Sequence, residues 1–424
     1  MQVNRRTLLR ASAAGAGVFA LGSPAILGQA KPRVVIIGGG PGGATAAKYI
    51  ARDSKGAVEV VLVEPKKQFT TCFHSNLYLG GFKTFAEITH GYDKLASAHG
   101  VNLNHQMATA IDRSAKRVVL ADGSRLAYDR LIVSPGIELK YDSVPGWGRE
   151  HEIAMPHAWL AGEQTQILKK RVEALSDGGT IVMIAPPNPY RCPPGPYERV
   201  SMMAHQLKKA GKTKSKIVII DPKESFSKQG LFQEGWEKYY PGQVEWMGPK
   251  THDGLKSVDP KTGEVVTGFE TYKAELVNVI PAQTAGKIAI DAQLTNASGF
   301  CPILPESMKS AMDPNIFVLG DASIAGDMPK SGFSANSQAK VAAMVVRGEL
   351  TGSRVFPARY ANTCWSLIDN DDVVKVGGAY EPKEGKIAAS STFVSKTKET
   401  SELRKQNTQE NIGWYAGIIN DMFT

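Results

Sequence analysis

Runs of β-branched residues alternate along this chain with stretches of helical periodicity. The run R-V-V-I-I at residues 33–37 has the composition of a buried parallel strand, and a helical stretch, A-T-A-A-K-Y-I-A-R, follows it after the turn G-G-G-P-G-G. A second such run, V-E-V-V-L-V, covers residues 58–63. Strand, turn, helix and strand in this order predict a parallel βαβ unit.

The turn of this unit carries a glycine pattern typical of dinucleotide binding. Gly38, Gly40 and Gly43 fit G-x-G-x-x-G, and Glu64 ends the second strand. A carboxylate there can accept from both hydroxyls of an adenosine ribose while the pyrophosphate rests on the helix N-terminus. The alternative, a glycine-rich turn that binds nothing, explains the glycines but not the register of the whole unit.

Two later segments predict further contacts to the same ligand. Residues 127–136 and 315–322 indicate strands, and the second places Asp321 at a carboxyl end, where ligands of open α/β sheets bind. Asp321 is therefore a candidate for a ribityl hydroxyl of FAD, although an acid at a strand end can also be a turn residue. Lys330 precedes a helix rich in small residues. It either stabilises negative charge on a reduced flavin or is a surface lysine, and the sequence leaves both open.

The middle of the chain predicts a second unit with strands at 180–185 and 216–221. A two-dinucleotide reductase has its second glycine-rich turn after the first of these strands, but here A-P-P-N-P-Y-R-C-P-P-G-P follows. Proline lacks an N–H, and its ring holds the backbone away from a pyrophosphate. We expect nicotinamide binding to be lost at this position.

The last part of the chain predicts a third unit. It combines a helix around R-Y-A-N-T-C-W-S-L-I-D, a hairpin-like pair near residues 373–394, and a C-terminal helix with a mildly apolar face for docking. The predicted fold class is α/β, with two Rossmann-like three-layer domains of the glutathione-reductase type and a small α+β domain. The predicted boundaries are 31–145 with 287–357 for the FAD-binding domain, 146–286 for the second domain, and 358–424 for the partner-docking domain.

Composition and charge add an export prediction. The chain has 424 residues, 42% hydrophobic and 21% charged, which is ordinary globular composition. Arg5, Arg6 and Arg10 precede a short uncharged run that ends in small residues, which predicts a signal peptide at residues 1–30, of the twin-arginine type. The run is too short and glycine-rich for a membrane anchor.

The formal net charge of the chain is +9, and its basic residues are scattered along the sequence. A mildly positive surface favours binding of anions and acidic protein partners, and the lack of a basic cluster argues against nucleic-acid binding.

The four cysteines follow no metal-binding spacing, so we expect no metal site. Cys192 lies next to Arg191 and shortly before a predicted helix, and both features favour a lowered thiol pKa. Cys364 falls on the apolar face of its predicted helix. A bond between Cys192 and Cys364 would be either a structural staple or a redox disulfide, and the sequence leaves both open. Cys301 lies among apolar residues, and we expect a buried, inert thiol.

Cys72, in T-T-C-F-H-S-N, is then the odd thiol downstream of the dinucleotide fingerprint. A positioned thiolate can add to the 8α-methyl group of a flavin and form a permanent thioether. Such a bond withdraws electron density and raises the flavin potential, which suits electron transfer to a haem.

Five motifs together carry a resemblance over the whole mature chain: T-C-F-H-S-N, R-C-P-P-G-P-Y-E, G-D-A-S-I-A, M-P-K-S-G-F-S-A-N-S-Q and Y-A-N-T-C-W-S-L. The chain resembles the flavoprotein subunit of flavocytochrome c sulfide dehydrogenase, a relative of the sulfide:quinone reductases. The resemblance implies FAD bound as an 8α-S-cysteinyl adduct of Cys72, and a redox-active disulfide between Cys192 and Cys364 beside the isoalloxazine. It also implies a c-type, usually dihaem, cytochrome subunit as partner in the periplasm.

The expected activity is oxidation of hydrosulfide to polysulfide or sulfur, with electrons passed to the cytochrome. Two alternatives stay open at this point. The protein could be a quinone-coupled enzyme of the peripheral membrane type, or a flavoprotein that maintains a sulfur-oxidation complex without turnover of its own.

Overall fold

The computed structural model describes residues 30–424, so the predicted signal peptide, apart from Ala30, lies outside the described residues. Contacts divide the chain into Met1–Lys31 and Pro32–Thr424, and the description that follows concerns the second part. None of the helices within the described residues is long and apolar enough to cross a membrane.

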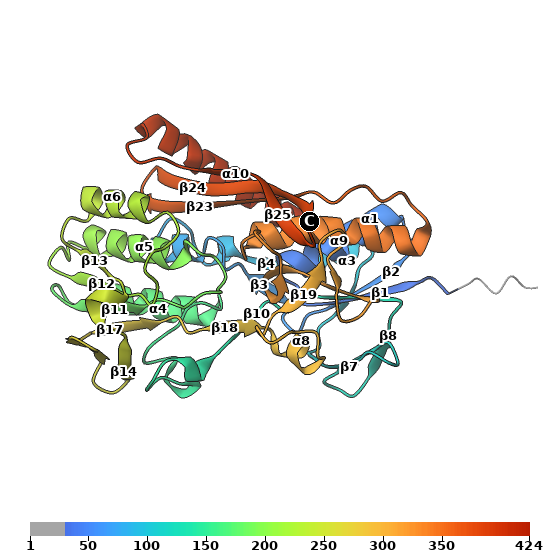
Figure 1. Ribbon diagram of the computed structural model, residues 1–424, viewed down its shortest axis with the longest axis horizontal. Helices are drawn as coiled ribbons and strands as arrows, with labels where there is room; N and C mark the ends of the chain where they lie inside the picture. Colours follow the sequence, from blue (N-terminus) through green and yellow to red (C-terminus); the bar gives the residue numbers. More distant parts are fainter. Residues whose placement is uncertain (1–29) are drawn as a thin grey trace, which may run out of the picture. The chain divides into compact units, whose positions relative to one another are not determined.

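The first predicted βαβ unit forms as expected within an eight-stranded sheet of order β22-β19-β20-β21-β9-β1-β2-β5. The five consecutive strands β21, β9, β1, β2 and β5 are parallel. Helices α1 and α9 pack against each other beside this sheet (Figure 1). The elements are β1 (Arg33–Ile37), α1 (Pro41–Ser54), β2 (Glu59–Val63), β5 (Asn102–Asn104), β9 (Arg130–Val133), β19 (Cys301–Leu304), β20 (Lys309–Ser310), β21 (Ile316–Val318), β22 (Ser323–Ile324) and α9 (Gly332–Thr351).

Smaller elements surround this sheet and shape the edge where its parallel strands end. The Cys72 segment lies between strand β3 and helix α2, and Asp321 lies in the short 3-10 helix η4. The remaining elements of this part are β3 (Gln68–Thr70), α2 (Ser75–Leu79), η1 (Ala86–Ile88), β4 (Thr89–Gly91), α3 (Asp93–His99), β6 (Ala108–Asp112), β7 (Arg117–Leu120), β8 (Arg125–Ala127), β10 (Ile137–Leu139), β18 (Gln283–Ala285), α8 (Lys287–Asp291) and η4 (Gly320–Ala322).

A second parallel sheet, of order β13-β12-β11-β17, contains both strands predicted in the middle of the chain. The proline-rich segment follows β11 and leads into α5. The elements are η2 (Tyr141–Ser143), η3 (Arg149–His151), α4 (Glu163–Ala174), β11 (Thr180–Ile184), α5 (Gly195–Lys209), β12 (Lys216–Ile220), α6 (Gln229–Tyr239), β13 (Val244–Met247), α7 (Pro249–His252), β14 (Leu255–Asp259), β15 (Glu264–Thr267), β16 (Thr271–Lys273) and β17 (Leu276–Val279). The mixed α/β class is thus confirmed, while the predicted domain boundaries stay predictions.

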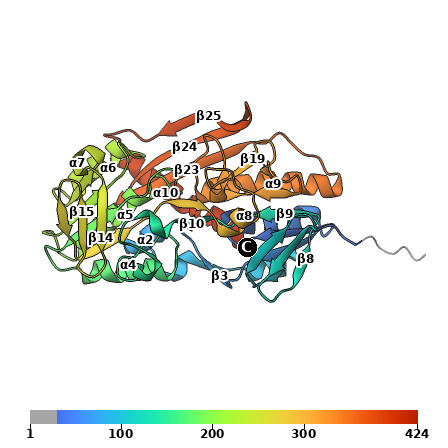
Figure 2. The ribbon, with the colours of Figure 1, turned by 60° about the horizontal axis from the view of Figure 1, so that its bottom comes forward.

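The C-terminal part is an antiparallel sheet of β23 (Tyr360–Asp369), β24 (Asp372–Lys383) and β25 (Lys386–Val394), followed by α10 (Ser401–Phe423). The hairpin and the C-terminal helix were predicted, but the helix predicted around Cys364 was wrong. This segment is strand β23, which pairs along its length with β24. Strand β23 contacts α5 and α6 of the middle part of the chain and also α9 of the first part, and the C-terminal sheet extends over both parts (Figures 1 and 2).

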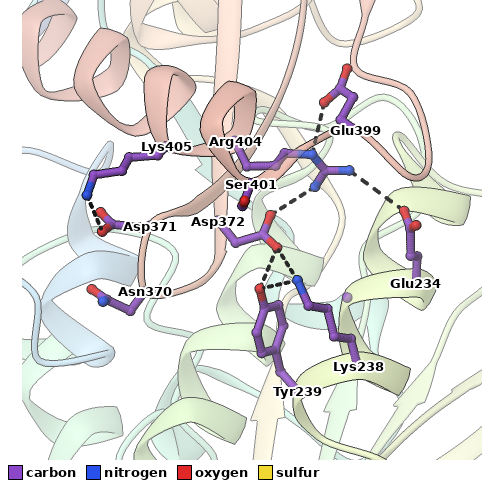
Figure 3. A pocket seen from close by; sticks show the side chains of 11 residues that line it. Glu234, Lys238, Tyr239, Asn370, Asp371, Asp372, Glu399, Ser401, Arg404 and Lys405 are labelled. Carbon is purple, nitrogen blue, oxygen red and sulfur yellow. Dashed lines mark hydrogen bonds and ion pairs between the residues drawn. The ribbon is translucent and has the colours of Figure 1, made fainter.

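The start of α10 is anchored by a cluster of charged side chains in a cleft of about 310 Å³ (Figure 3). The Arg404 guanidinium, 8% exposed, lies 2.9 Å from a carboxylate oxygen of Asp372 and 2.9 Å from one of Glu399. It also lies 3.7 Å from Glu234, which belongs to α6. One buried arginine therefore joins α10 to the β23–β24 turn and to α6.

Candidate functional site

The glycine-rich turn has the geometry that a dinucleotide cradle requires. Gly38 has φ +98°, and a Cβ atom there would lie 2.3 Å from the Ser134 carbonyl oxygen. A Cβ atom on Gly43 would lie 1.8 Å from the Gly38 carbonyl oxygen, so the turn and α1 can approach this closely only through glycine. Gly40 is the N-cap residue of α1. The free backbone N–H groups at the N-terminus of this helix suit a pyrophosphate.

Glu64 is held at the end of β2 by two backbone N–H groups. The Gly39 N–H donates to one carboxylate oxygen over 2.9 Å, and the Lys66 N–H donates to the other over 3.0 Å. The side chain lines the same cleft as the glycine turn. Its position fits a ribose contact, which stays a prediction.

A cleft of about 310 Å³ joins these groups to Asp321 and Cys72. Oxygen Oδ1 of Asp321 is buried and has no hydrogen-bond partner among the described residues. Burial raises the pKa of this carboxyl group. The positive charges of Arg191, 3.9 Å away, and of Lys330 partly offset this increase. An unpaired buried acceptor at the carboxyl end of a sheet fits a ligand hydroxyl, as expected for a flavin ribityl chain.

Lys330 is half-buried rather than a surface residue. Its ammonium donates to the carbonyl oxygens of Asp321 and Ser323, over 2.9 and 2.6 Å, and lies 4.0 Å from the centre of the Phe300 ring. Burial lowers its pKa to about 8. The Lys330 carbonyl oxygen accepts from the Cys192 N–H over 2.7 Å, so the residue braces the thiol loop. A role in stabilising flavin charge stays a prediction.

Cys72 lies where the cleft meets a smaller inner cavity of about 50 Å³ and lines both. The Ser75 hydroxyl donates to the Cys72 carbonyl oxygen over 2.6 Å. The neighbouring Thr71 hydroxyl lies 3.1 Å from the Tyr415 hydroxyl, which belongs to α10. The loop that presents this thiol is therefore fixed by the C-terminal helix.

His74 makes the second connection from this loop to α10. Its Nε2 atom lies 3.0 Å from Oδ1 of Asn411, and its ring stacks on Tyr415 with centroids 4.1 Å apart. Burial lowers the pKa of His74 to about 4, so the ring is neutral near pH 7. The sequence carried no signal for these contacts, because the partners lie more than 300 residues apart.

Cys192 lies in the loop before α5, with φ +55°, and lines the inner cavity with Arg191 and Cys72. The prediction of an acidic thiol was wrong. Burial raises its pKa well above the ordinary value, the charges of Cys364, Glu198 and Cys72 add to this, and Arg191 opposes it only weakly.

Cys364 reaches the same region from β23. Its sulfur lies 3.6 Å from the amide nitrogen of Asn362, which donates to it. Burial raises the pKa of this thiol, while Lys228 and the hydrogen bond with Asn362 oppose the shift. The charge of Cys364 also raises the pKa of Cys192, so the two thiols lie close enough to interact electrostatically. The structure contains both as free thiols.

Two charged residues that the sequence reasoning missed are packed around this thiol pair. Glu198 of α5 accepts from the Asn76 amide and from the Leu367 N–H, both over 2.9 Å, and burial raises its pKa. Glu198 is the last residue of the motif R-C-P-P-G-P-Y-E, six positions after Cys192, and this short spacing could have marked it as a candidate site residue. Lys228, at the start of α6, carried no local signal.

Cys301 is buried on β19, as predicted, with 0% exposure, and burial raises its pKa to about 12. Residues 30–424 contain no group of three or more His, Cys, Asp or Glu side chains placed to hold a metal ion.

The fold and the site define a protein of the pyridine nucleotide-disulphide oxidoreductase class, whose sequence model matches residues 32–170. Two more specific models match further parts of the chain. They describe the central region of the sulfide dehydrogenase (flavocytochrome c) flavoprotein chain, over residues 165–281, and the flavin-binding region of flavocytochrome c sulphide dehydrogenase, over residues 357–423. The chain belongs to the family of flavocytochrome c sulfide dehydrogenase flavoprotein chains, and the flavin-binding match supports a flavin cofactor.

The similar curated proteins include a flavoprotein chain of the same family and two quinone-linked sulfide oxidoreductases. The flavoprotein chain of sulfide dehydrogenase from Chlorobaculum thiosulfatiphilum is 54% identical over 44 residues, which are 10% of this chain and 90% of that one. The mitochondrial sulfide:quinone oxidoreductase of Dictyostelium discoideum is 22% identical over 69% of this chain and 65% of its own length. The sulfide-quinone reductase of Aquifex aeolicus is 28% identical over 42% and 40%. The chain thus spans less than two thirds of the two quinone-linked relatives.

Solved structures share the fold. The sulfide:quinone oxidoreductase of Aquifex aeolicus superposes with a TM-score of 0.70 over 92% of both chains, at 17% identity. Putidaredoxin reductase, in its covalent complex with putidaredoxin, gives a TM-score of 0.66 over 90% of this chain and 94% of that one, at 18% identity.

Proposed function

We propose that the protein is the flavoprotein subunit of a sulfide dehydrogenase, which oxidises hydrosulfide to polysulfide or sulfur and passes the electrons to a c-type cytochrome. One observation carries the proposal. Cys72 and Cys192, from two distant segments, line the same inner cavity, and Cys364, from a third segment, is close enough for its charge to raise the pKa of Cys192. Three cysteines with this arrangement, beside a dinucleotide cradle, support thiol chemistry coupled to a flavin.

The residues of the cleft fit FAD. The cradle of Gly38, Gly40 and Gly43 would take the pyrophosphate, Glu64 the ribose, and the unpaired oxygen of Asp321 a ribityl hydroxyl. Cys72, at the inner end of the cleft, would provide the covalent 8α-S-cysteinyl link. A bound flavin supplies the ability to accept two electrons together and to release them one at a time.

The sulfur step belongs to Cys192 and Cys364, which we propose form a disulfide in the oxidised protein. Hydrosulfide attacks one sulfur, so that a new S–S bond forms as a persulfide while the Cys192–Cys364 bond breaks and its electron pair stays on the other cysteine as a thiolate. A second hydrosulfide then displaces the outer sulfur into a polysulfide. The two cysteines, left reduced, return to the disulfide when two electrons leave.

The family supports the proposed partner, and the N-terminal sequence supports the proposed location. A flavocytochrome implies a cytochrome partner, for which we propose a dihaem c-type subunit. The basic N-terminal segment supports export to the periplasm, where such cytochromes are assembled.

Cys192→Ser tests the disulfide step. The variant should keep its flavin and yellow colour but lose sulfide-dependent cytochrome c reduction by at least a hundredfold, because no disulfide can form. Cys301→Ala is the matched control, since that thiol is fully buried and lines neither the cleft nor the inner cavity, and it should keep the activity. Full activity in Cys192→Ser would end the disulfide mechanism.

Cys72→Ser tests the covalent link. Acid precipitation of the unfolded wild-type chain should leave flavin absorbance in the pellet, whereas the variant should release its flavin into the supernatant. Flavin that still precipitates with the variant would remove Cys72 from the linkage.

A quinone-coupled enzyme is the second candidate, because the similarity extends to sulfide:quinone oxidoreductases in sequence and in fold. A protein of that type would sediment with membranes and reduce a quinone analogue with sulfide. Co-purification with a haem polypeptide from the periplasm, without quinone reduction, would decide for the cytochrome-coupled enzyme.

A further inference from the structure

Lys228 is a buried cation beside the thiol pair, and the proposed sulfur step does not use it. The residue lies at the start of α6, and 9% of its surface is exposed. No carboxylate within residues 30–424 lies within 4.0 Å of its ammonium. By contrast, the ammonium of Lys223, whose side chain is 9% exposed, lies 2.6 Å from Asp221. A buried charge without a partner is costly, so a cation kept there needs another source of stabilisation.

The three N–H groups of the ammonium are directed at β23, the strand that carries Cys364, and at the neighbouring strand β24. They donate to the Cys364 carbonyl oxygen over 3.1 Å, the Ser366 hydroxyl over 2.8 Å and the Val374 carbonyl oxygen over 3.2 Å. All three acceptors are neutral. The ammonium therefore fixes the backbone of Cys364 while most of its charge remains uncompensated.

Negative charge at Cys364 is the counter-charge that this arrangement favours. Burial lowers the pKa of Lys228 to about 8, and among the groups that oppose this lowering the charge of Cys364 is the largest, followed by Glu198 and Cys192. In return, Lys228 is the foremost of the groups that lower the pKa of the Cys364 thiol. The other titratable groups coupled to Cys364 are Glu198, Cys192 and Tyr380.

We propose that Lys228 is a positioning residue that stabilises the thiolate form of Cys364 with its buried positive charge while holding β23 and β24 in place. Loss of the Cys364 proton to solvent then leaves an ion pair in a region of low dielectric, where charge stabilisation is strong. The inference deepens the proposed function, on which its meaning rests, because each thiol exchange places negative charge on one sulfur of the Cys192–Cys364 pair.

The test measures the thiol itself in the reduced full-length protein. The rate of iodoacetamide alkylation at Cys364 is followed against pH by mass spectrometry of its peptide, in wild type, Lys228→Gln and Lys228→Arg. Glutamine keeps two N–H donors for the strand acceptors but removes the charge. We expect its alkylation midpoint to move up by about one pH unit, so that the rate below the midpoint falls about tenfold. Arginine should restore the wild-type midpoint.

Lys223→Gln is the matched control, because it removes another largely buried lysine that already has a carboxylate partner, and it should leave the midpoint unchanged. An unchanged midpoint in Lys228→Gln would overturn the proposal. Should Lys228→Gln fold poorly, Lys228→Arg alone decides: a midpoint that rises although the cation is retained would overturn the proposal too. Because alkylation requires neither sulfide nor flavin, a shifted midpoint without sulfide turnover would refute the proposed function and leave this inference standing.

Discussion

The glycine-rich turn has room for only a hydrogen atom in place of a side chain at Gly43. A methyl group in its place would overlap the Gly38 carbonyl oxygen, which belongs to rigid backbone and cannot give way as a flexible side chain would. The glycine is therefore required by the fold of the turn as well as by any ligand.

Gly43→Ala should lower the free energy of unfolding by about 1–3 kcal/mol, the usual cost of overpacking, and should reduce the flavin content of the purified protein. Gly417→Ala is the matched control, because its Cβ atom would meet nothing within 4 Å in the interior of α10. It should raise stability by about 0.5–1 kcal/mol. Urea unfolding and flavin absorbance measure both effects, and a neutral Gly43→Ala would contradict the close approach.

Single residues also show where sequence reasoning failed. The glycines, Glu64 and Asp321 could be placed because strand ends and turns are local features. The state of Cys192 could not, because its local neighbours, Arg191 and a helix start, both favour a thiolate. The burial that outweighs them comes from segments remote in sequence, such as β23 and the Cys72 loop.

At the scale of elements, β23 also shows that contacts remote in sequence can outweigh a local pattern. Tyr360, Cys364, Leu367 and Ile368 have helical spacing, but Tyr360, Cys364 and Ile368 also share one face of a strand. Pairing with β24 over nearly its whole length decided for the strand, and no local pattern of the segment contains that partner.

The anchor of α10 allows a direct prediction. Arg404→Gln leaves Asp372, 10% exposed, without its arginine, and only the Tyr239 hydroxyl and the more distant Lys238 remain (Figure 3). Breaking a buried ion pair from one side costs about 3–5 kcal/mol. We expect a loss of this size in urea unfolding, together with faster amide exchange in the first turns of α10.

Lys405→Gln removes a neighbouring cation that is 63% exposed and pairs with an exposed Asp371. Surface pairs contribute about 0–1 kcal/mol, so this variant should be nearly as stable as wild type. Equal losses in the two variants would show that net charge, and not the buried pair, stabilises this corner.

At the scale of the whole molecule, two buried histidines make stability depend on pH. Burial lowers the pKa of His74 to about 4 and that of His157 to about 3, against an ordinary value near 6.5. The folded protein thus resists protonation that the unfolded chain accepts. The stability from these rings is fully present above pH 6.5 and is lost as the pH falls toward the folded-state values.

His74→Gln isolates one of these contributions. A shift of this size corresponds to about 3 kcal/mol, so the wild type should lose about that much more stability than the variant between pH 7 and pH 4. Urea unfolding at several pH values measures the difference. Parallel stability curves for the two proteins would mean that the folded protein protonates His74 as readily as the unfolded chain does.

The hydrogen bonds between the Cys72 loop and α10 also set an order of events in the cell. Thr71 and His74 find their partners, Tyr415 and Asn411, 344 and 337 residues further along. At about 5–20 residues per second, a ribosome needs roughly tens of seconds to synthesise the intervening chain. Chemistry that requires the finished loop around Cys72 therefore begins only after translation is almost complete, and a nascent chain that stalls before α10 would emerge with that loop unsupported.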